Sequence, residues 1–295
     1  MATTSEWIQG ARPRTLPAAV APVLAGLGVT GYTGTSLQAG RLVLNALLAL
    51  LVSLCLQIGV NFYNDYHDGI RGTDEVRVGP VRLVGQKLAA PAQVRAAALI
   101  SLALAALIGL LLVLLSGAWV MLPLGAAAIL AAWGYTGGSK PYGYLGLGEV
   151  FVFIFFGPVA VCGTTLVTGG HVGLVAALAA TAIGLLTVAI LVTNNLRDLE
   201  LDEQSGKNTL AVRLGDAGSR RLFAACLIVP FVIVAWLAIL TTGWALLAMI
   251  GAVPAIKAAQ EVLEHAYGRG LIPVLQSTSL ALLLTGLGLG VGLSI

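Results

Sequence analysis

The sequence predicts an all-α protein that crosses a membrane about nine times. Of its 295 residues, 58% are hydrophobic and only 10% are charged, whereas charged residues make up about a quarter of a soluble domain. The apolar residues gather in runs of about 20, the length that a helix needs to cross a bilayer. Backbone groups in lipid must bond within their own segment, so these runs predict helices rather than strands. The composition excludes a water-soluble enzyme.

Nine apolar runs are the candidate spans. They cover residues 16–31, 41–63, 96–115, 118–135, 150–168, 172–193, 222–241, 243–260 and 272–294. We expect them to form a single bundle over residues 1–295, with a central cavity that opens near the cytoplasmic face. Their layout suggests two four-helix halves, at about 1–145 and 146–265, followed by the ninth helix.

Charge predicts the orientation of this bundle. With nine spans, the N-terminal tail and the loops after spans two, four, six and eight share one side, and they hold every one of the 16 basic residues except Arg41. The positive-inside rule makes that side cytoplasmic, with the N-terminus inside and the C-terminus outside a cell membrane. All 13 acidic residues lie on the same side. Acids contribute little to topology, so their position indicates chemistry there, and the mixed charge argues against nucleic acid as a partner.

The second span ends in a polar face. Gln57, Asn61, Asn64, Asp65 and Asp68 fall on one stripe about 100° wide when the chain turns by 100° per residue. Ionisable groups are costly within a membrane and usually face a cavity or a charged partner. This face therefore predicts a functional site at one end of the bundle.

The sixth span ends in the same way, with Asn194, Asp198 and Asp202 on successive helical turns. Aligned carboxylates repel one another, and a divalent cation removes that repulsion. Mg²⁺ binds through a few carboxylates together with substrate phosphates, so the two motifs together predict a magnesium-bound diphosphate. The alternative is that these acids only form ion pairs with Arg71 and Arg197.

Basic residues near the two motifs are candidates for contacts with diphosphate oxygens. They are Arg71, Lys140, Arg197 and Lys207.

Residues 64–68 (NDYHD) and 194–202 (NNLRDLELD) resemble the paired aspartate-rich motifs of the UbiA superfamily of intramembrane prenyltransferases. Residues 7–17, 79–84, 142–157 and 206–215 resemble the members that prenylate 1,4-dihydroxy-2-naphthoate, and the likeness covers nearly the whole chain. The sequence departs from the pattern at Gly72, where many members have a further aspartate; the next acid is Asp74.

The resemblance implies a Mg²⁺-dependent enzyme of menaquinone biosynthesis. It would transfer a polyprenyl group from polyprenyl diphosphate to 1,4-dihydroxy-2-naphthoate, with loss of CO₂ and diphosphate, to give demethylmenaquinone. The family's roles in holding Mg²⁺ and diphosphate would fall on Asn64, Asp68, Asp198 and Asp202, with Asn194 beside them. Membrane lipid would surround the prenyl tail.

The aromatic acceptor requires contacts of its own. Its carboxylate calls for a cation, for which Arg12 and Arg14 are candidates. Glu149 is a candidate base or hydrogen-bond partner for a naphthol hydroxyl, although it could equally cap its own helix. Tyr142 and nearby tyrosines could stabilise a developing allylic cation or anchor the protein at the membrane interface.

Two other functions remain open from the sequence. One is prenylation of a different acceptor, such as 4-hydroxybenzoate. The other is ion-coupled transport, because intramembrane carboxylates also bind transported ions. The position of both acid clusters at one face argues against transport, which generally uses a central site. The sequence indicates neither the prenyl chain length nor the oligomeric state.

Overall fold

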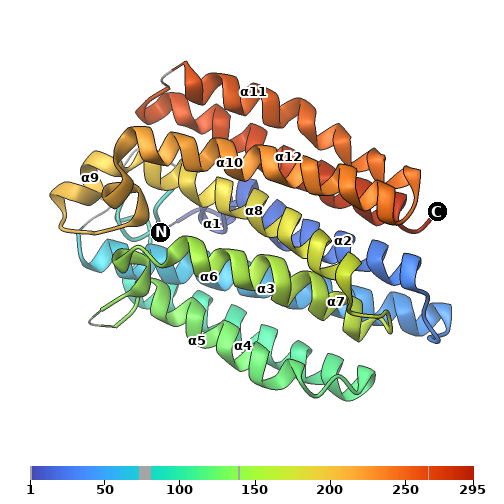
Figure 1. Cartoon of the computed structure of the whole chain (residues 1–295). Helices are drawn as coiled ribbons and strands as arrows, with labels where there is room; N and C mark the ends of the chain where they lie inside the picture. Colours follow the sequence, from blue (N-terminus) through green and yellow to red (C-terminus); the bar gives the residue numbers. More distant parts are fainter. Residues whose placement is uncertain (1, 73–80, 139, 265) are drawn as a thin grey trace.

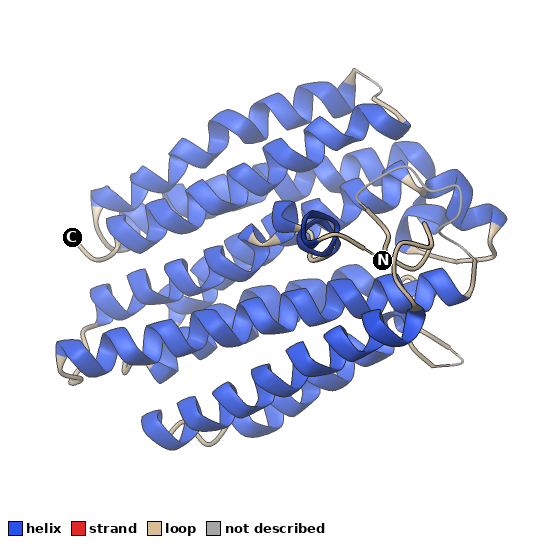
Figure 2. Ribbon diagram, turned by 180° about the vertical axis from the view of Figure 1, so that it is seen from behind, coloured by secondary structure: helices blue, strands red, loops and turns tan. Residues whose placement is uncertain are grey.

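The computed structural model describes residues 2–72, 81–138, 140–264 and 266–295. Within these ranges the chain contains helices and loops and no strands, as Figure 2 shows. The long helices run side by side in one slanting bundle, and the two termini lie at opposite ends of it (Figure 1). The predicted all-α class is confirmed. Asp74, the acid that follows the first motif, lies outside the described residues, as does Gly79.

The first part of the chain, up to residue 138, is drawn in blue to green in Figure 1. Its helices are α1 (Thr4–Gly10), the 3₁₀ turn η1 (Pro13–Thr15), α2 (Pro17–Thr33), α3 (Ala39–Ile70), α4 (Pro91–Ser116) and α5 (Met121–Thr136).

The second part begins with a short turn and a broken helix. Its elements are η2 (Tyr142–Leu145), α6 (Gly148–Ile154), the π-helix η3 (Phe155–Cys162), α7 (Gly163–Val167), α8 (Leu174–Arg197), α9 (Leu199–Gln204), α10 (Leu210–Leu240), η4 (Gly243–Gly251), α11 (Ala252–Leu263), η5 (Gly268–Gly270) and α12 (Leu271–Gly292).

The number of membrane spans follows from helix length and composition. Among the described residues, seven helical segments are long and apolar enough to cross a membrane, or eight if the bent pair Thr4–Thr15 and Pro17–Thr33 counts as one span. Each remaining predicted run also forms a helix, but α5 has only 16 residues. The exact count of nine is therefore not confirmed. Large apolar side chains on the outer surface, such as Leu107 and Ile239, are well exposed, as expected of a surface that faces lipid.

The seam between α2 and α12 is closed by glycines. A Cβ atom at Gly28 would lie 2.3 Å from the carbonyl oxygen of Leu289, and one at Gly286 would lie 2.7 Å from Ala21. Small residues let membrane helices approach this closely, and the packing contacts then hold them together.

Asp65 holds the segment after α3 in place. Its carboxylate is buried and accepts hydrogen bonds from the backbone N–H groups of Leu83, at 2.7 Å, and Val84, at 3.2 Å. The sequence places Asp65 on the same stripe as Asn64 and Asp68, but its side chain bonds the backbone of Leu83 and Val84 instead. Asp65 thereby fixes the position of Arg82, which lies one residue before this contact.

We predict that Asp65→Ala destabilises the protein by about 2 kcal/mol or more, because two buried N–H donors lose their acceptor. The measurement is the thermal unfolding midpoint in detergent. Asp65→Asn, which keeps one acceptor oxygen, should cost less. An unchanged midpoint for the alanine variant would show that this contact does not anchor the segment.

Candidate active site

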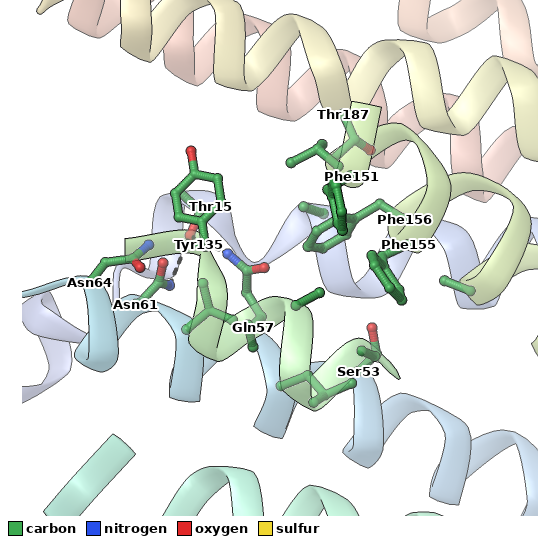
Figure 3. A pocket seen from close by; sticks show the side chains of 18 of the residues that line it. Thr15, Ser53, Gln57, Asn61, Asn64, Tyr135, Phe151, Phe155, Phe156 and Thr187 are labelled. Carbon is green, nitrogen blue, oxygen red and sulfur yellow. Dashed lines mark hydrogen bonds between the residues drawn. The ribbon is translucent and has the colours of Figure 1, made fainter. Parts of the chain in front are cut away.

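A cavity of about 1060 Å³ lies inside the bundle between α3, α4, α5, the α6–η3–α7 segment and α8. One end is polar and the remainder is apolar. Figure 3 shows this division, with Asn61, Asn64 and Gln57 toward one end and Phe151, Phe155 and Phe156 toward the other. The polar end is lined by Asn64, Asp68, Arg82, Asn194, Arg197, Asp202 and Lys207.

The first motif enters the cavity from the last turns of α3. Asn64 Oδ1 accepts a hydrogen bond from Thr136 Oγ1 at 2.9 Å. Asp68 accepts one from the Tyr144 hydroxyl at 2.5 Å, and Arg82 Nη1 lies 4.0 Å from its other oxygen. Asp68 and Arg82 are both buried. The polar end is therefore a network of hydrogen bonds and ion pairs shielded from water, rather than a helix end exposed to solvent.

Lys207 joins the two motifs. Its ammonium nitrogen lies 3.5 Å from Asp68 Oδ1 and 3.6 Å from Asp202 Oδ1, and its side chain is buried. The same nitrogen lies 4.5 Å from the centre of the Tyr144 ring. Carboxylates separated by over 130 residues of chain therefore converge on one positive charge. The two motifs therefore meet at one end of the bundle.

The second motif differs from the predicted continuous helix. α8 ends at Arg197, Asp198 takes φ −99° and ψ 6°, and α9 begins at Leu199. Both oxygens of Asp198 accept hydrogen bonds from the Arg197 guanidinium, at 2.8 and 2.7 Å. Asp198 is buried and lies outside the residues that line the cavity, whereas Asn194 and Asp202 line it. Asp202 therefore lines the cavity, whereas Asp198 bonds Arg197.

The four predicted diphosphate contacts occupy different positions. Lys207 and Arg197 line the cavity. Arg71 is exposed and donates hydrogen bonds to the carbonyls of Thr136 and Gly138, each at 2.7 Å, so it ties α3 to the end of α5. Lys140 is exposed and lies away from the cavity lining.

Arg82 is a site residue that sequence reasoning missed. It is buried, lines the cavity and lies beside Asp68. The only sequence signal was its place within residues 79–84, one of the stretches that carry the family resemblance.

The predicted acceptor contacts surround the same cavity. Arg12 and Arg14 line it, and the amide of Gln276, once its oxygen faces Arg14, accepts bonds from that guanidinium at 3.2 and 3.0 Å. Tyr142 also lines the cavity and stacks on Phe151 with ring centres 4.1 Å apart. These groups give the cavity a basic edge and an aromatic wall.

Glu149 lies just behind this wall. It is buried and accepts a hydrogen bond at 2.8 Å from Asn195, which does line the cavity. Any effect of Glu149 on a ligand would therefore pass through Asn195.

Polar side chains also extend along α3 into the cavity. Gln57 Nε2 and Asn61 Nδ2 each donate to Thr15 Oγ1 at 3.2 Å, and Figure 3 marks the second of these bonds. Gln57 Oε1 is buried and has no hydrogen-bond partner among the described residues. An unpaired buried acceptor is costly, so this oxygen is a candidate contact for a polar group of a ligand.

Tyr144 and Tyr142 remain hydrogen-bond donors at all ordinary pH values. Burial raises the pKa of Tyr144 far above its usual value, and the negative charge of Asp68 raises this pKa further. Burial alone raises the pKa of Tyr142. The Tyr144 hydroxyl thus keeps its proton and donates it in the hydrogen bond to Asp68.

The oxygen atoms at the polar end can hold a metal ion only when a bound ligand supplies further oxygen atoms. Among the described residues, no group of three or more His, Cys, Asp or Glu side chains could hold a metal ion alone. Asp68, Asp202 and Asn64 supply hard oxygen atoms, and Mg²⁺ generally binds one or two carboxylates together with substrate phosphates. The arrangement therefore fits Mg²⁺ bound jointly by protein and diphosphate.

Comparison with known proteins identifies the family. Residues 19–270 match the model of the UbiA prenyltransferase family. A 1,4-dihydroxy-2-naphthoate octaprenyltransferase of Mycobacterium tuberculosis is 50% identical over 287 residues, which cover 97% of this chain and 96% of that protein. The protein of the same name from Escherichia coli is 36% identical, with 96% of this chain and 93% of that protein covered.

Solved structures share the fold at low sequence identity. A UbiA homolog from Aeropyrum pernix, solved in the apo form, has a TM-score of 0.68 at 16% identity and covers 93% of this chain and 96% of its own. A UbiA homolog from Archaeoglobus fulgidus bound to DMAPP and Mg²⁺ has a TM-score of 0.64 at 13% identity, covering 98% and 99%. With this fold, the two converging motifs and relatives of this identity over nearly their whole length, the chain belongs to the UbiA prenyltransferase family.

Proposed function

We propose that this protein transfers a polyprenyl group from polyprenyl diphosphate to 1,4-dihydroxy-2-naphthoate, with loss of diphosphate and CO₂, in menaquinone biosynthesis. The observation that carries this proposal is the convergence of Asp68 and Asp202 on Lys207, at the polar end of a large apolar cavity. A diphosphate suits the polar end and a prenyl chain suits the remainder. The names of the full-length relatives supply the acceptor.

The polar end binds the leaving group. Lys207, Arg197 and Arg82 contact the diphosphate oxygens and stabilise the charge that develops on them as the carbon–oxygen bond breaks. When bound, Mg²⁺ neutralises part of this charge. Asp68, Asp202 and Asn64, with Asn194 beside them, are the ligands we assign to it. Asp198 acts through Arg197, whose guanidinium it orients.

The aromatic wall faces the allylic carbon. Tyr142 and Phe151, with Tyr135 next to them, present ring faces that stabilise positive charge and leave space for a flat acceptor. Arg12 or Arg14 pairs with the acceptor carboxylate. Arg71 and Lys140 rank below Lys207 as diphosphate contacts, because both are exposed.

The charge asymmetry of the loops supports an orientation for this site. The polar end would open to the cytoplasmic side of a cell membrane, with the N-terminus inside and the C-terminus outside. The division into two four-helix halves and a last helix stays a prediction.

The activity is tested with purified protein in lipid vesicles, a polyprenyl diphosphate and Mg²⁺. We expect prenylated, decarboxylated product from 1,4-dihydroxy-2-naphthoate and little from 4-hydroxybenzoate, measured by mass spectrometry. A preference for 4-hydroxybenzoate would show that the protein is a prenyltransferase with a different acceptor from the one proposed. No prenylated product with either acid would contradict it.

We predict that Asp68→Asn and Asp202→Asn each lower kcat/KM by about 10² or more, the loss expected when a group that stabilises transition-state charge is removed. Chelation of Mg²⁺ should abolish turnover reversibly in the wild type. Gel filtration and thermal unfolding would check that the variants remain folded. Near-normal activity of both variants would contradict the assignment of Asp68 and Asp202 as Mg²⁺ ligands.

We predict that Lys207→Met weakens productive binding of the prenyl diphosphate by about tenfold or more, since a buried charge contact of this kind is worth about 1.5–3 kcal/mol. Lys140→Met is the matched control, because it removes the same ammonium group from an exposed position. The measurement is KM for the diphosphate substrate. Equal changes in KM for the two variants would contradict the assignment of the buried Lys207 as the diphosphate contact.

A further inference from the structure

The wall of the cavity formed by α4 and α5 combines large apolar side chains, such as Leu110 and Ile129, with several small ones. On this wall the lining residues include Ala105, Ala106 and Gly109 from α4 and Gly125, Ala128 and Ala132 from α5. The opposite wall carries large apolar groups. At the glycine positions the width of the cavity depends on the missing side chain.

Gly109 and Gly125 lie on either side of the turn between α4 and α5. They are equally far along the chain from Gly117, which ends α4 in the left-handed conformation and begins the turn into α5. Thr136, whose hydroxyl bonds Asn64, follows Gly125 by eleven residues of α5. At 1.5 Å per residue this places Gly125 about 16 Å from the polar end.

The space in front of these two glycines belongs to the cavity. A Cβ atom at Gly125 would meet nothing within 4 Å, and one at Gly109 would meet only Val52, at 3.8 Å. Gly163, which also lines the cavity, differs, because its Cβ would lie 2.6 Å from the Met121 side chain. Side chains added at Gly125 or Gly109 would therefore enter the cavity rather than displace the protein.

The π-helix keeps the opposite wall continuous at this depth. Phe151, Phe155, Val159 and Gly163 are spaced by four residues and all line the cavity. In an α-helix, with 3.6 residues per turn, positions four apart drift around the axis. The wider turn of the π segment corrects this drift, so one face of the α6–η3–α7 segment follows the cavity along its length.

We propose that Gly125, together with Gly109, determines how long a prenyl chain this enzyme accepts. This inference rests on the proposed function. A geranyl chain ends well short of the glycine level, whereas an octaprenyl chain must pass it.

The test is a graded series of variants, Gly125→Ala, Gly125→Leu and Gly125→Phe, assayed in vesicles with geranyl and octaprenyl diphosphate. The measured quantity is the ratio of kcat/KM for octaprenyl diphosphate to that for geranyl diphosphate. We expect this ratio to fall in that order and by about tenfold or more for phenylalanine, the scale on which a pocket discriminates by size. Gly109→Leu should lower the ratio in the same direction.

Gly40→Leu is the control for the loss of a helical glycine. Gly40 is exposed in the first turn of α3, away from the cavity lining, and a Cβ there would meet nothing within 4 Å. The Gly40→Leu variant should have the same ratio of kcat/KM values for the two diphosphates as the wild type. Gly125 and Gly109 variants that fold and keep the wild-type ratio would overturn the inference. A wild-type protein that prenylates no acceptor with either diphosphate would instead overturn the proposed function.

Discussion

Buried carboxylates from distant parts of a chain repel one another unless a positive charge lies between them. In this protein the Lys207 ammonium fills that role, within 3.6 Å of both Asp68 and Asp202. Burial of one charge without the other would cost several kcal/mol, so the ends of α3 and α9 are held together by this contact. Tyr144 adds a hydrogen bond to Asp68, and Arg82 adds a second positive charge. The loops that carry these residues are positioned by the same network.

The polar network also explains why the rest of the cavity can be apolar. The charges that we assign to diphosphate binding lie at one end, and the walls beyond them are mainly apolar, with phenylalanine, leucine, valine, alanine and glycine residues. Close packing elsewhere, as between α2 and α12 at Gly28, keeps the bundle rigid around this space. A site that holds a strongly charged group and a long apolar chain thus combines two environments along one axis.

Much of this architecture was predictable because membrane helices obey a simple rule: long apolar runs become helices. The polar faces of the second and sixth spans were also predictable, since helical periodicity alone aligns Asn64 with Asp68. The number of spans was harder, because α5 is short and the first span is bent from the N-terminal helices by 47°.

Tertiary contacts decided the remaining features. Periodicity placed Asp65 with the site residues, but two backbone N–H groups 18 and 19 residues further along the chain take its carboxylate. Helical periodicity does not distinguish Lys207 from Lys140, although one is buried between two acids and the other is exposed. The break at Asp198 is a further feature that a helical wheel does not represent, because the wheel assumes an unbroken helix.

The central claim is that acids from both motifs bind one divalent metal ion together with the substrate diphosphate. Anomalous diffraction from crystals grown with Mn²⁺ and an unreactive prenyl thiodiphosphate tests this claim most directly. We predict a manganese peak at the polar end of the cavity, bound by oxygens of Asp68 and Asp202 and by the diphosphate. A peak bound by only one motif, or one outside the cavity, would contradict the account.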